Sequence, residues 1–387
     1  MFEYRLSDDT WGKEELEAIQ EVIRSNRYTM GPKTAEFEEQ FAAFFGAKYA
    51  VMVNSGSSAN LIAIAALIYS EKLKAGDEVI VPAVSWSTTY YPLQQYGLKL
   101  KFVDIDVDTL NLDLKQVEEA LTEKTKAVFA VNLLGNPIDY DYLQEICDRR
   151  NLILIEDNCE SLGAKFKGKY TGTFGLLGTF STFYSHHICT MEGGVIVTDD
   201  KNLFHLMKSL RAHGWTREMP HNSPLYSKKE NDFYEQFNFI FPGYNVRPLE
   251  MEAAIGIKQI DKIETIIKNR RENASKFISE IGAVNGIKLQ KEVGESSWFG
   301  FSMVLEGELE GRRDELIKLL TENGIENRPI VAGNFTKNHV IKYFDYEVHN
   351  ELTNADYIHE NGFFVGNHSK RQFESIKLIK KVLMNEF

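Results

Sequence analysis

The chain has 387 residues, of which 43% are hydrophobic, and this is enough for one large domain with its own core and a smaller second domain. Its 44 Lys and Arg residues against 56 Asp and Glu residues give a formal net charge of −12, which would repel a polyanion, so we expect no nucleic-acid partner. The three cysteines have no spacing that suits a zinc site or an iron–sulfur cluster, so we expect no metal.

The first residues and the most apolar run of the chain indicate where in the cell the protein is expected. The first residues, MFEYRLSDDTW, include acidic side chains and no apolar stretch like that of a secretory signal. The longest unbroken aliphatic run, Leu61 to Ile68, has eight residues, whereas a membrane-spanning helix needs about 18 to 20. We therefore expect no membrane contact and a cytoplasmic location.

Between about residues 49 and 198, short apolar runs rich in β-forming residues alternate with helix-like segments. The runs are continuous rather than alternating polar and apolar, which is typical of strands covered by helices on both faces. In chain order they are YAVMV, EVIVPAV, LKFVDI, KAVFAVNLL, LILIED, FSTFY and GVIVT. The pattern predicts an α/β fold with a mostly parallel, doubly wound sheet, whose ligands gather at the C-terminal ends of the strands.

The remainder of the chain predicts a loop and a second domain. Between Ala212 and Phe241 the sequence is polar and contains proline and asparagine, which indicates a long functional loop that is mobile or reaches a partner subunit. The amphipathic stretch after Pro248 predicts a helix that leads into a C-terminal α+β domain. We place the boundary near residue 250, so that residues 1–250 form the large domain and residues 251–387 the small one.

Three predicted strand ends carry residues suited to a ligand. The segment Asn54 to Asn60 precedes a helical run, and its free amides with Gly56 and several hydroxyls suit a phosphate, although the same residues are also ordinary helix caps. Asp157 could hold a heteroaromatic nitrogen protonated, or cap a helix. Trp86 could stack on an aromatic ring, or fill the core.

A fourth segment carries two adjacent histidines, His186 and His187, after the predicted strand FSTFY. An imidazole there could serve as a general base near neutral pH. Joint chelation of a metal is disfavoured, because adjacent side chains on an extended segment point to opposite faces. We expect one of the two histidines to be structural.

Taken in order and spacing, these segments resemble the DegT/DnrJ/EryC/StrS family of nucleotide-sugar aminotransferases, which have the fold type I architecture and depend on pyridoxal phosphate. The resemblance runs from Thr29-Met30-Gly31 to the end of the chain. It implies a homodimer with shared active sites, because the family uses the asparagine at position 245 to reach the cofactor phosphate of the neighbouring subunit. The residues that it assigns to the cofactor are Gly56, Ser57 and Ser181 at the phosphate, Trp86 on the ring, Asp157 at the ring nitrogen, Glu160 near the ring hydroxyl and Asn245 from the partner.

The chain departs from the family at one position. Six residues before Glu192 of the Glu-Gly-Gly signature, where the family has its cofactor-anchoring lysine, this sequence has His186. No lysine lies between Lys169 and Lys201 to replace it. An imidazole cannot take the place of the lysine amine, so the resemblance implies that pyridoxal phosphate and its amine form, pyridoxamine phosphate, are held non-covalently while His186 transfers protons.

Within this family a histidine here is typical of 3-dehydratases of 4-keto-6-deoxy sugars. The resemblance implies that glutamate supplies the amine and that GDP-4-keto-6-deoxy-D-mannose loses its 3-hydroxyl, with release of ammonia and 2-oxoglutarate. A plain 4-aminotransferase, as in perosamine synthesis, and a non-catalytic cofactor-binding protein are the alternatives. The candidates for binding the sugar or the diphosphate are Met30, His213, Arg217 and Arg247.

Overall fold

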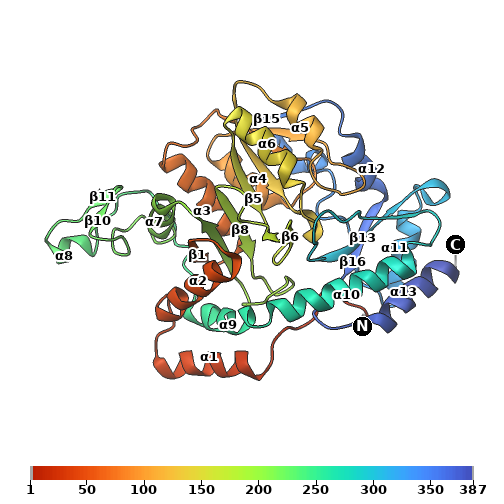
Figure 1. The fold of residues 1–387 in the computed structure, drawn as a ribbon, viewed down its shortest axis with the longest axis horizontal. Helices are drawn as coiled ribbons and strands as arrows, with labels where there is room; N and C mark the ends of the chain where they lie inside the picture. The colour runs from red at the N-terminus through yellow and green to blue at the C-terminus, as the bar shows by residue number, and fades with distance from the viewer. Residues whose placement is uncertain (1–2, 386–387) are drawn as a thin grey trace.

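The computed structural model describes residues 3–385, and its centre is one eight-stranded sheet (Figure 1). The pairs β1–β9 and β9–β8 are antiparallel, and the other pairs are parallel, so the predicted mostly parallel sheet is confirmed. In spatial order the strands are β1 (Tyr49–Val53), β9 (Gly194–Thr198), β8 (Leu177–Ser181), β5 (Ile153–Asp157), β4 (Thr125–Val131), β2 (Glu78–Pro82), β3 (Lys99–Val103) and β15 (Tyr346–Val348).

Helices cover both faces of this sheet, as a doubly wound fold requires. In β1, Val51 and Val53 pack against one layer of helices, whereas Ala50 and Met52 pack against the other, because successive strand side chains point to opposite faces. One layer consists of α3 (Gly56–Tyr69), α4 (Ser87–Gln95), α7 (Lys201–Leu210) and α12 (Thr353–Asn361). The other consists of α2 (Pro32–Phe45), α9 (Glu250–Ile260), α5 (Leu114–Ala120) and α6 (Tyr140–Arg150).

The strand before the two histidines lies earlier than the sequence predicted. It begins at Leu177, whereas the predicted run FSTFY begins at Phe180. The prediction failed because Gly178 weakens the strand signal of the preceding residues. In the structure this glycine is required, since a Cβ there would lie 2.0 Å from the carbonyl oxygen of Gly172. The strand ends at Ser181, and the following residues form turns that lead to the histidines.

The apolar run Leu61 to Ile68 forms the middle of α3. This helix packs against β8 and β9 of the sheet and against α4 and α7, and residues 62–67 have no exposed surface. A helix surrounded by protein on all sides needs apolar residues on all sides, which explains the run. No helix within residues 3–385 combines the length and the apolar character needed to cross a membrane.

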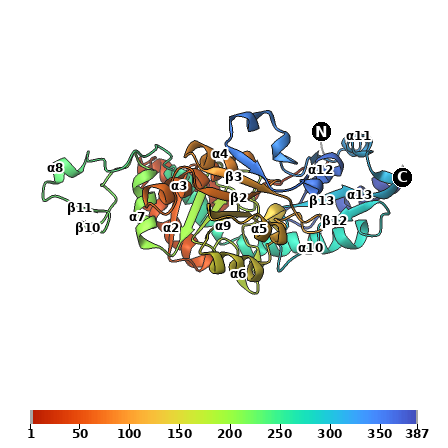
Figure 2. The ribbon, with the colours of Figure 1, turned by 90° about the horizontal axis from the view of Figure 1, so that it is seen from above.

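A second, antiparallel sheet lies towards the C-terminal end of the chain (Figure 2). We propose residues 1–250 and 251–387 as the two domains. Each contributes one segment to the core or sheet of the other. Tyr4 is buried in the second core and donates its hydroxyl to the carbonyl of Gly366, and β15 joins the large sheet beside β3. The elements of the second core are α10 (Ile263–Ile281), β12 (Ile287–Leu289), β13 (Gly300–Leu305), α11 (Arg313–Glu322), β14 (Asn327–Arg328), β16 (Gly362–Gly366) and α13 (Phe373–Asn385).

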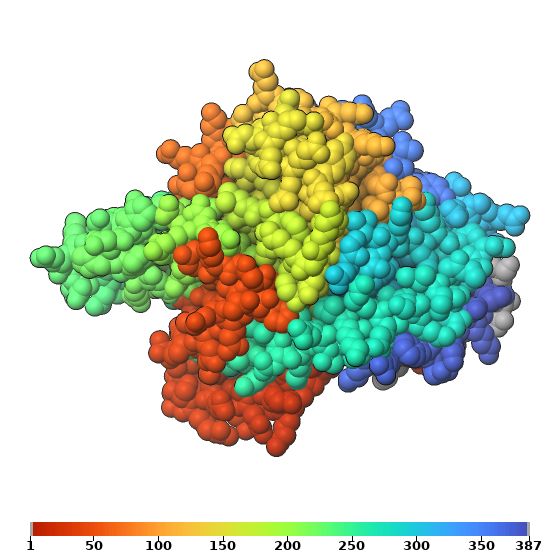
Figure 3. Space-filling model, viewed as in Figure 1, coloured from red at the N-terminus to blue at the C-terminus, as the bar shows by residue number. Residues whose placement is uncertain are grey.

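Residues 215–241, which we call the arm, stand out from the body of the molecule (Figures 1, 2 and 3). The arm contains β10 (Asn222–Ser223), β11 (Tyr226–Ser227) and α8 (Asp232–Glu235). It presents large apolar side chains to solvent, with Phe233 80% and Phe237 62% exposed. The other elements are α1 (Lys13–Ser25), β6 (Lys165–Phe166), β7 (Lys169–Tyr170) and the 3-10 turns Leu133–Gly135, Gly307–Leu309, Phe335–Lys337 and His339–Tyr343.

Candidate active site

A cavity of about 390 Å³ opens at the C-terminal ends of β4, β5 and β8. This is where a doubly wound sheet is expected to bind its ligands. The cavity brings together seven residues that were predicted from widely separated segments. Its lining is formed by Ser55, Gly56, Ser57, Ser85, Trp86, Thr88, Val131, Leu133, Asp157, Cys159, Glu160, Ser181, Phe183, Ser185, His186, Glu192 and Val331.

The N-terminus of α3 forms one end of the cavity. Ser55 caps the helix by accepting a hydrogen bond from the N–H of Ser58, which leaves the N–H groups of Gly56 and Ser57 without a carbonyl inside the helix. Ser181, at the end of β8, lies directly against Gly56, because a Cβ at Gly56 would be 2.6 Å from the Cβ of Ser181. Free amides, a helix dipole and two serine hydroxyls make this end suited to a phosphate.

Asp157 ends β5 and is 6% exposed. Its Oδ2 accepts hydrogen bonds from Asn60 Nδ2 at 2.9 Å and from Thr89 Oγ1 at 2.8 Å. Its Oδ1 accepts a hydrogen bond from the N–H of Cys159 at 3.1 Å. The carboxylate therefore enters the cavity already oriented by three donors.

His186 offers one particular nitrogen to the cavity. Its Nδ1 lies 2.6 Å from the carbonyl oxygen of Cys159, and because a carbonyl only accepts, Nδ1 carries the proton and Nε2 is the basic nitrogen. Burial lowers the pKa of His186 from 6.5 to about 4, although the Cys159 carbonyl and the charge of Asp157 oppose this shift. The imidazole is therefore neutral, and able to accept a proton, throughout the physiological range.

His187, unlike His186, does not line the cavity. It is fully buried, its Nε2 lies 3.2 Å from the carbonyl oxygen of Ser297, and burial lowers its pKa well below 6.5. Phe299 packs against both rings, with its centroid 5.1 Å from that of His186 and 5.8 Å from that of His187. His187 and Phe299 thus support the position of His186. Among residues 3–385 there is no group of His, Cys, Asp and Glu side chains placed to bind a metal.

Glu160 lines the cavity and accepts a hydrogen bond from the N–H of Leu134 at 3.0 Å. Burial raises its pKa from 4.5 to about 7, and this N–H opposes the shift while Asp157 adds to it. The cavity thus holds a carboxyl group that is partly protonated near neutral pH beside an imidazole that is neutral. Trp86 stands at the rim with 59% of its surface exposed, so its face is open for stacking and it is not a core tryptophan.

The remaining predicted site residues lie outside the lining of this cavity. Asn245 is exposed and accepts a hydrogen bond from Arg247 Nε at 2.9 Å. Arg217 and Arg247 lie over the ring of Trp215, and the His213 ring packs against the same indole. Met30 lines a separate surface pocket with Arg211 and Glu218. Within one chain the structure therefore does not bring these candidates to His186.

The sequence analysis gave no role to several residues of the site. The only sequence signal for Asn60 and Thr89 was their closeness to Gly56 and Trp86 along the chain. The hydrogen bonds that join them to Asp157 depend on the packing of α3 and α4 against the sheet. Cys159 follows Asp157 by two residues, which was the only sequence signal for it. Val331 comes from the C-terminal part of the chain, where no motif indicated it.

Comparisons with known proteins agree with this geometry. A profile described as the DegT/DnrJ/EryC1/StrS aminotransferase family matches residues 9–383. A GDP-4-keto-6-deoxy-D-mannose 3-dehydratase of Escherichia coli O55:H7 is 54% identical over 387 residues, which cover 99% of this chain and 100% of that protein. A protein of the same name from Yersinia pseudotuberculosis is 53% identical over 387 residues, with 99% and 98% covered. A solved structure of GDP-4-keto-6-deoxymannose-3-dehydratase with a trapped PLP-glutamate geminal diamine has a TM-score of 0.97 at 54% identity, and the match covers 98% of this chain and 100% of that chain.

Proposed function

The chain belongs to the DegT/DnrJ/EryC1/StrS aminotransferase family, and from this premise we propose that it is a pyridoxal phosphate-dependent dehydratase. Its substrate is GDP-4-keto-6-deoxy-D-mannose, from which it removes the 3-hydroxyl, with glutamate as the amine donor. Two full-length relatives above 50% identity carry this activity in their names, and a solved relative holds pyridoxal phosphate with glutamate. The products are a GDP-linked 4-keto-3,6-dideoxy sugar, ammonia and 2-oxoglutarate.

The residues of the cavity fit pyridoxal phosphate. A phosphate needs an anion site, and the N-terminus of α3 with Ser57 and Ser181 provides one. A pyridine nitrogen needs an anion to stay protonated, and the buried carboxylate of Asp157 provides it. Bound in this cavity, the cofactor supplies a conjugated ring that accepts electrons and, in its amine form, a primary amine for the 4-keto group of the sugar.

The chain's own residues hold these groups and move the protons. Gly56, Ser57 and Ser181 hold the phosphate, and Trp86 covers one face of the ring. Asp157 keeps the ring nitrogen protonated, which strengthens the ring as an electron acceptor. His186 Nε2 takes a proton during the amination by glutamate and again during the loss of the 3-hydroxyl, and returns a proton to the departing oxygen.

One observation carries the proposal, namely a neutral histidine where an aminotransferase has its lysine. Among the described residues no lysine lines the cavity, so no side-chain amine can bond to the cofactor or displace the product from it. Water must do so instead. Because the 3-hydroxyl has already left, the sugar amine that water releases is an enamine, which tautomerises to an imine, and a second water converts this imine to the 4-keto group and ammonia. A base that transfers protons without forming a bond therefore favours dehydration over transamination.

We also propose that two copies of the chain form a dimer with shared active sites in the cytoplasm. Asn245 supports the shared site, because it is exposed and lies outside the cavity of its own chain although the family resemblance assigns it to a cofactor phosphate. The exposed aromatic residues of the arm are a surface that a second copy would cover. The three cysteines are free thiols, which agrees with a reducing compartment.

The proposed function is tested by incubating the purified protein with pyridoxal phosphate, glutamate and GDP-4-keto-6-deoxy-D-mannose. Mass spectrometry should show a sugar nucleotide that has lost one oxygen, and assays should find free ammonia and 2-oxoglutarate. An amino sugar without free ammonia would identify an aminotransferase instead. Binding of the cofactor without any turnover of this substrate would point to another nucleotide sugar or to a non-catalytic protein.

A further inference from the structure

We propose that Asn60 and Thr89 are positioning residues, which fix the orientation and the negative charge of Asp157 before the cofactor enters the cavity. This inference rests on the proposed function, because the group that Asp157 would face is the ring nitrogen of pyridoxal phosphate. Neither residue lines the cavity, whereas Asp157 does. The two side chains therefore act on the cofactor only through the carboxylate.

Both side chains donate to the same oxygen of Asp157. Thr89 Oγ1 lies 2.8 Å and Asn60 Nδ2 lies 2.9 Å from Oδ2, and the backbone of Cys159 donates to Oδ1. Within residues 3–385 no cationic side chain forms an ion pair with Asp157, which is 6% exposed. A buried carboxylate without an ionic partner keeps its charge only where hydrogen bonds stabilise it. Two of the three donors that do so are these side chains.

Each donor is itself held in one orientation. Thr179 donates its hydroxyl to Asn60 Oδ1 at 2.6 Å, so the amide nitrogen of Asn60 must face Asp157. Thr89 Oγ1 lies 2.8 Å from Ser85 Oγ. Because Thr89 gives its proton to the carboxylate, Ser85 must donate to Thr89. In each of these hydrogen bonds it is therefore fixed which atom donates and which accepts.

The network joins two helices and two central strands of the sheet. Asn60 lies early in α3, Thr89 lies in the first turn of α4, Asp157 ends β5, and Thr179 lies in β8. Two helices thus hold the carboxylate from behind while its cavity side stays open. Such second-layer hydrogen bonds typically set the orientation and proton affinity of the group in front of them.

Loss of one donor has a definite consequence for the ring nitrogen. Asp157 and a protonated ring nitrogen form an ion pair, which competes with a neutral pair in which the carboxyl carries the proton. Hydrogen bonds to the carboxylate stabilise only the ion pair. Removing a donor should therefore move the shared proton from the ring nitrogen towards the carboxyl group, lowering the ratio of ion pair to neutral pair by about tenfold.

The experiment measures where that shared proton lies. The holoprotein is prepared with pyridoxal phosphate isotope-labelled at the ring nitrogen, and the nitrogen chemical shift is followed by NMR as the pH is varied. Thr89→Val keeps the shape and removes the donor, whereas Thr89→Ser keeps the donor. Where the pair holds one proton, we expect the chemical shift of T89V to move towards that of a neutral ring nitrogen, by the amount that a ratio of ion pair to neutral pair about tenfold lower gives, and that of T89S to match the wild type.

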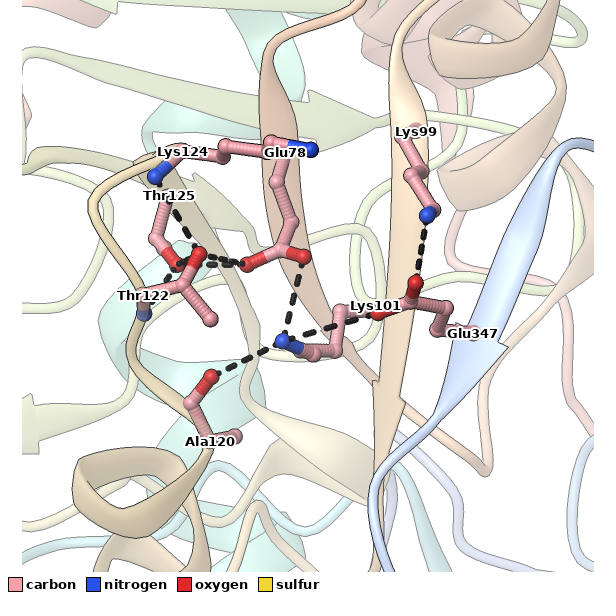
Figure 4. Close-up of polar contacts among 8 residues, drawn as sticks. All are labelled: Glu78, Lys99, Lys101, Ala120, Thr122, Lys124, Thr125 and Glu347. Carbon is pink, nitrogen blue, oxygen red and sulfur yellow. Dashed lines mark hydrogen bonds and ion pairs between the residues drawn. The ribbon is translucent and has the colours of Figure 1, made fainter.

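Two further variants separate a charge effect from a folding effect. Thr125→Val is the matched control, because it removes another buried hydroxyl that donates to a carboxylate, that of Glu78 at 2.6 Å, at a distant part of the sheet (Figure 4). Asn60→Leu removes the second donor and replaces T89V if that variant does not fold. A ring-nitrogen chemical shift that is unchanged in both T89V and N60L, with cofactor bound, would overturn this inference alone. A wild-type chain that binds no pyridoxal phosphate would overturn the proposed function, and this inference with it.

Discussion

His186 is the base of the proposed reaction, and its surroundings set its protonation state. Its Nδ1–H is bound to the carbonyl of Cys159, and burial lowers its pKa to about 4. The folded chain therefore holds fewer protons at this site than the unfolded chain between pH 6.5 and about 4. It follows that the imidazole keeps its basic form until the pH falls towards 4, whereas the free energy of unfolding decreases across the whole window as the pH falls from 6.5 to about 4.

His186→Asn should separate binding from chemistry. The amide cannot accept a proton from carbon, so turnover should fall by about 100- to 10,000-fold, the usual contribution of a general base. Cofactor binding, followed by the absorption spectrum of pyridoxal phosphate, should remain within about threefold of wild type. Ser185→Ala, which alters a neighbouring residue of the lining, is the control and should stay active. A His186→Asn enzyme that kept half of its activity would show that another residue moves the proton.

Glu160 should make the stability of the cofactor-free protein depend on pH. Its pKa is raised to about 7 by burial, so between pH 4.5 and about 7 the folded chain binds more protons than the unfolded chain. The free energy of unfolding therefore falls as the pH rises through this window. Glu160→Gln keeps an oxygen for the N–H of Leu134 and removes the ionisable group. Its melting temperature should exceed that of the wild type by about 2 °C above pH 8.

The measurement for Glu160→Gln is thermal unfolding of the cofactor-free protein across the pH range. Near pH 4 the two proteins should melt together, because Glu160 is then protonated in both states. An equal difference at all pH values would mean that the substitution acts through packing and not through ionisation.

At the scale of residues, the sequence predicted those parts of the site that sit in motifs. Gly56, Asp157 and His186 lie at or within a few residues of strand ends, and the structure places them around one cavity. Asn60 and Thr89 could not be predicted, because a hydrogen bond between two helices and a strand end depends on how those elements pack.

At the scale of elements, β15 is a strand from the C-terminal part of the chain that pairs with β3 of the large sheet (Figure 4). Lys101 of β3 is nearly buried, and its Nζ lies 3.1 Å from Glu78 Oε2 and 3.8 Å from Glu347 Oε2 of β15. The other oxygen of Glu78 accepts hydrogen bonds from Thr122 and Thr125. The edge of the sheet is thus organised around one buried ion pair with a second, exposed carboxylate beside it.

Glu78→Gln should destabilise the protein much more than Glu347→Gln. The side chain of Glu78 is 3% exposed, so its loss leaves Lys101 charged and poorly compensated in the interior, at a cost of about 3 kcal/mol. The side chain of Glu347 is 49% exposed, and its pairs with Lys101 and Lys99 should contribute less than about 1 kcal/mol. Urea unfolding of both variants measures the difference, and equal costs would contradict the view that burial decides it.

The elements that the sequence predicted best are those with continuous apolar runs. The strand ranges from YAVMV to LILIED and GVIVT agree with β1 to β5 and β9 within a few residues. The prediction placed β8 too late in the sequence. Gly178 has a low strand propensity, but its lack of a side chain allows the close contact with Gly172. The strand β15 was not predicted, because three exposed residues are too few for a strand pattern, and only pairing with β3 makes them a strand.

At the scale of the whole molecule, the candidate residues fall into two groups that do not meet within one chain. His186, Asp157 and the phosphate end share the cavity, whereas Asn245 and the cluster around Trp215 lie elsewhere, near the base of the arm. If both groups serve one reaction, a second chain must bring them together. A symmetric dimer does this at two equivalent sites, since each surface of one chain meets its counterpart on the other.

Mixing two inactive variants decides whether the sites are shared. His186→Asn removes the base and leaves Asn245 intact, whereas Asn245→Asp leaves the base and places a negative charge where the proposed dimer holds a phosphate. In a mixed dimer one site has both lesions, and the other has His186 from one chain and Asn245 from its partner. After subunits are exchanged at equal amounts, half of the dimers are mixed, so activity should return to about a quarter of the wild-type value. If Asn245 acted within its own chain, no site in any mixed dimer would be intact, and the mixture would stay as inactive as its parents.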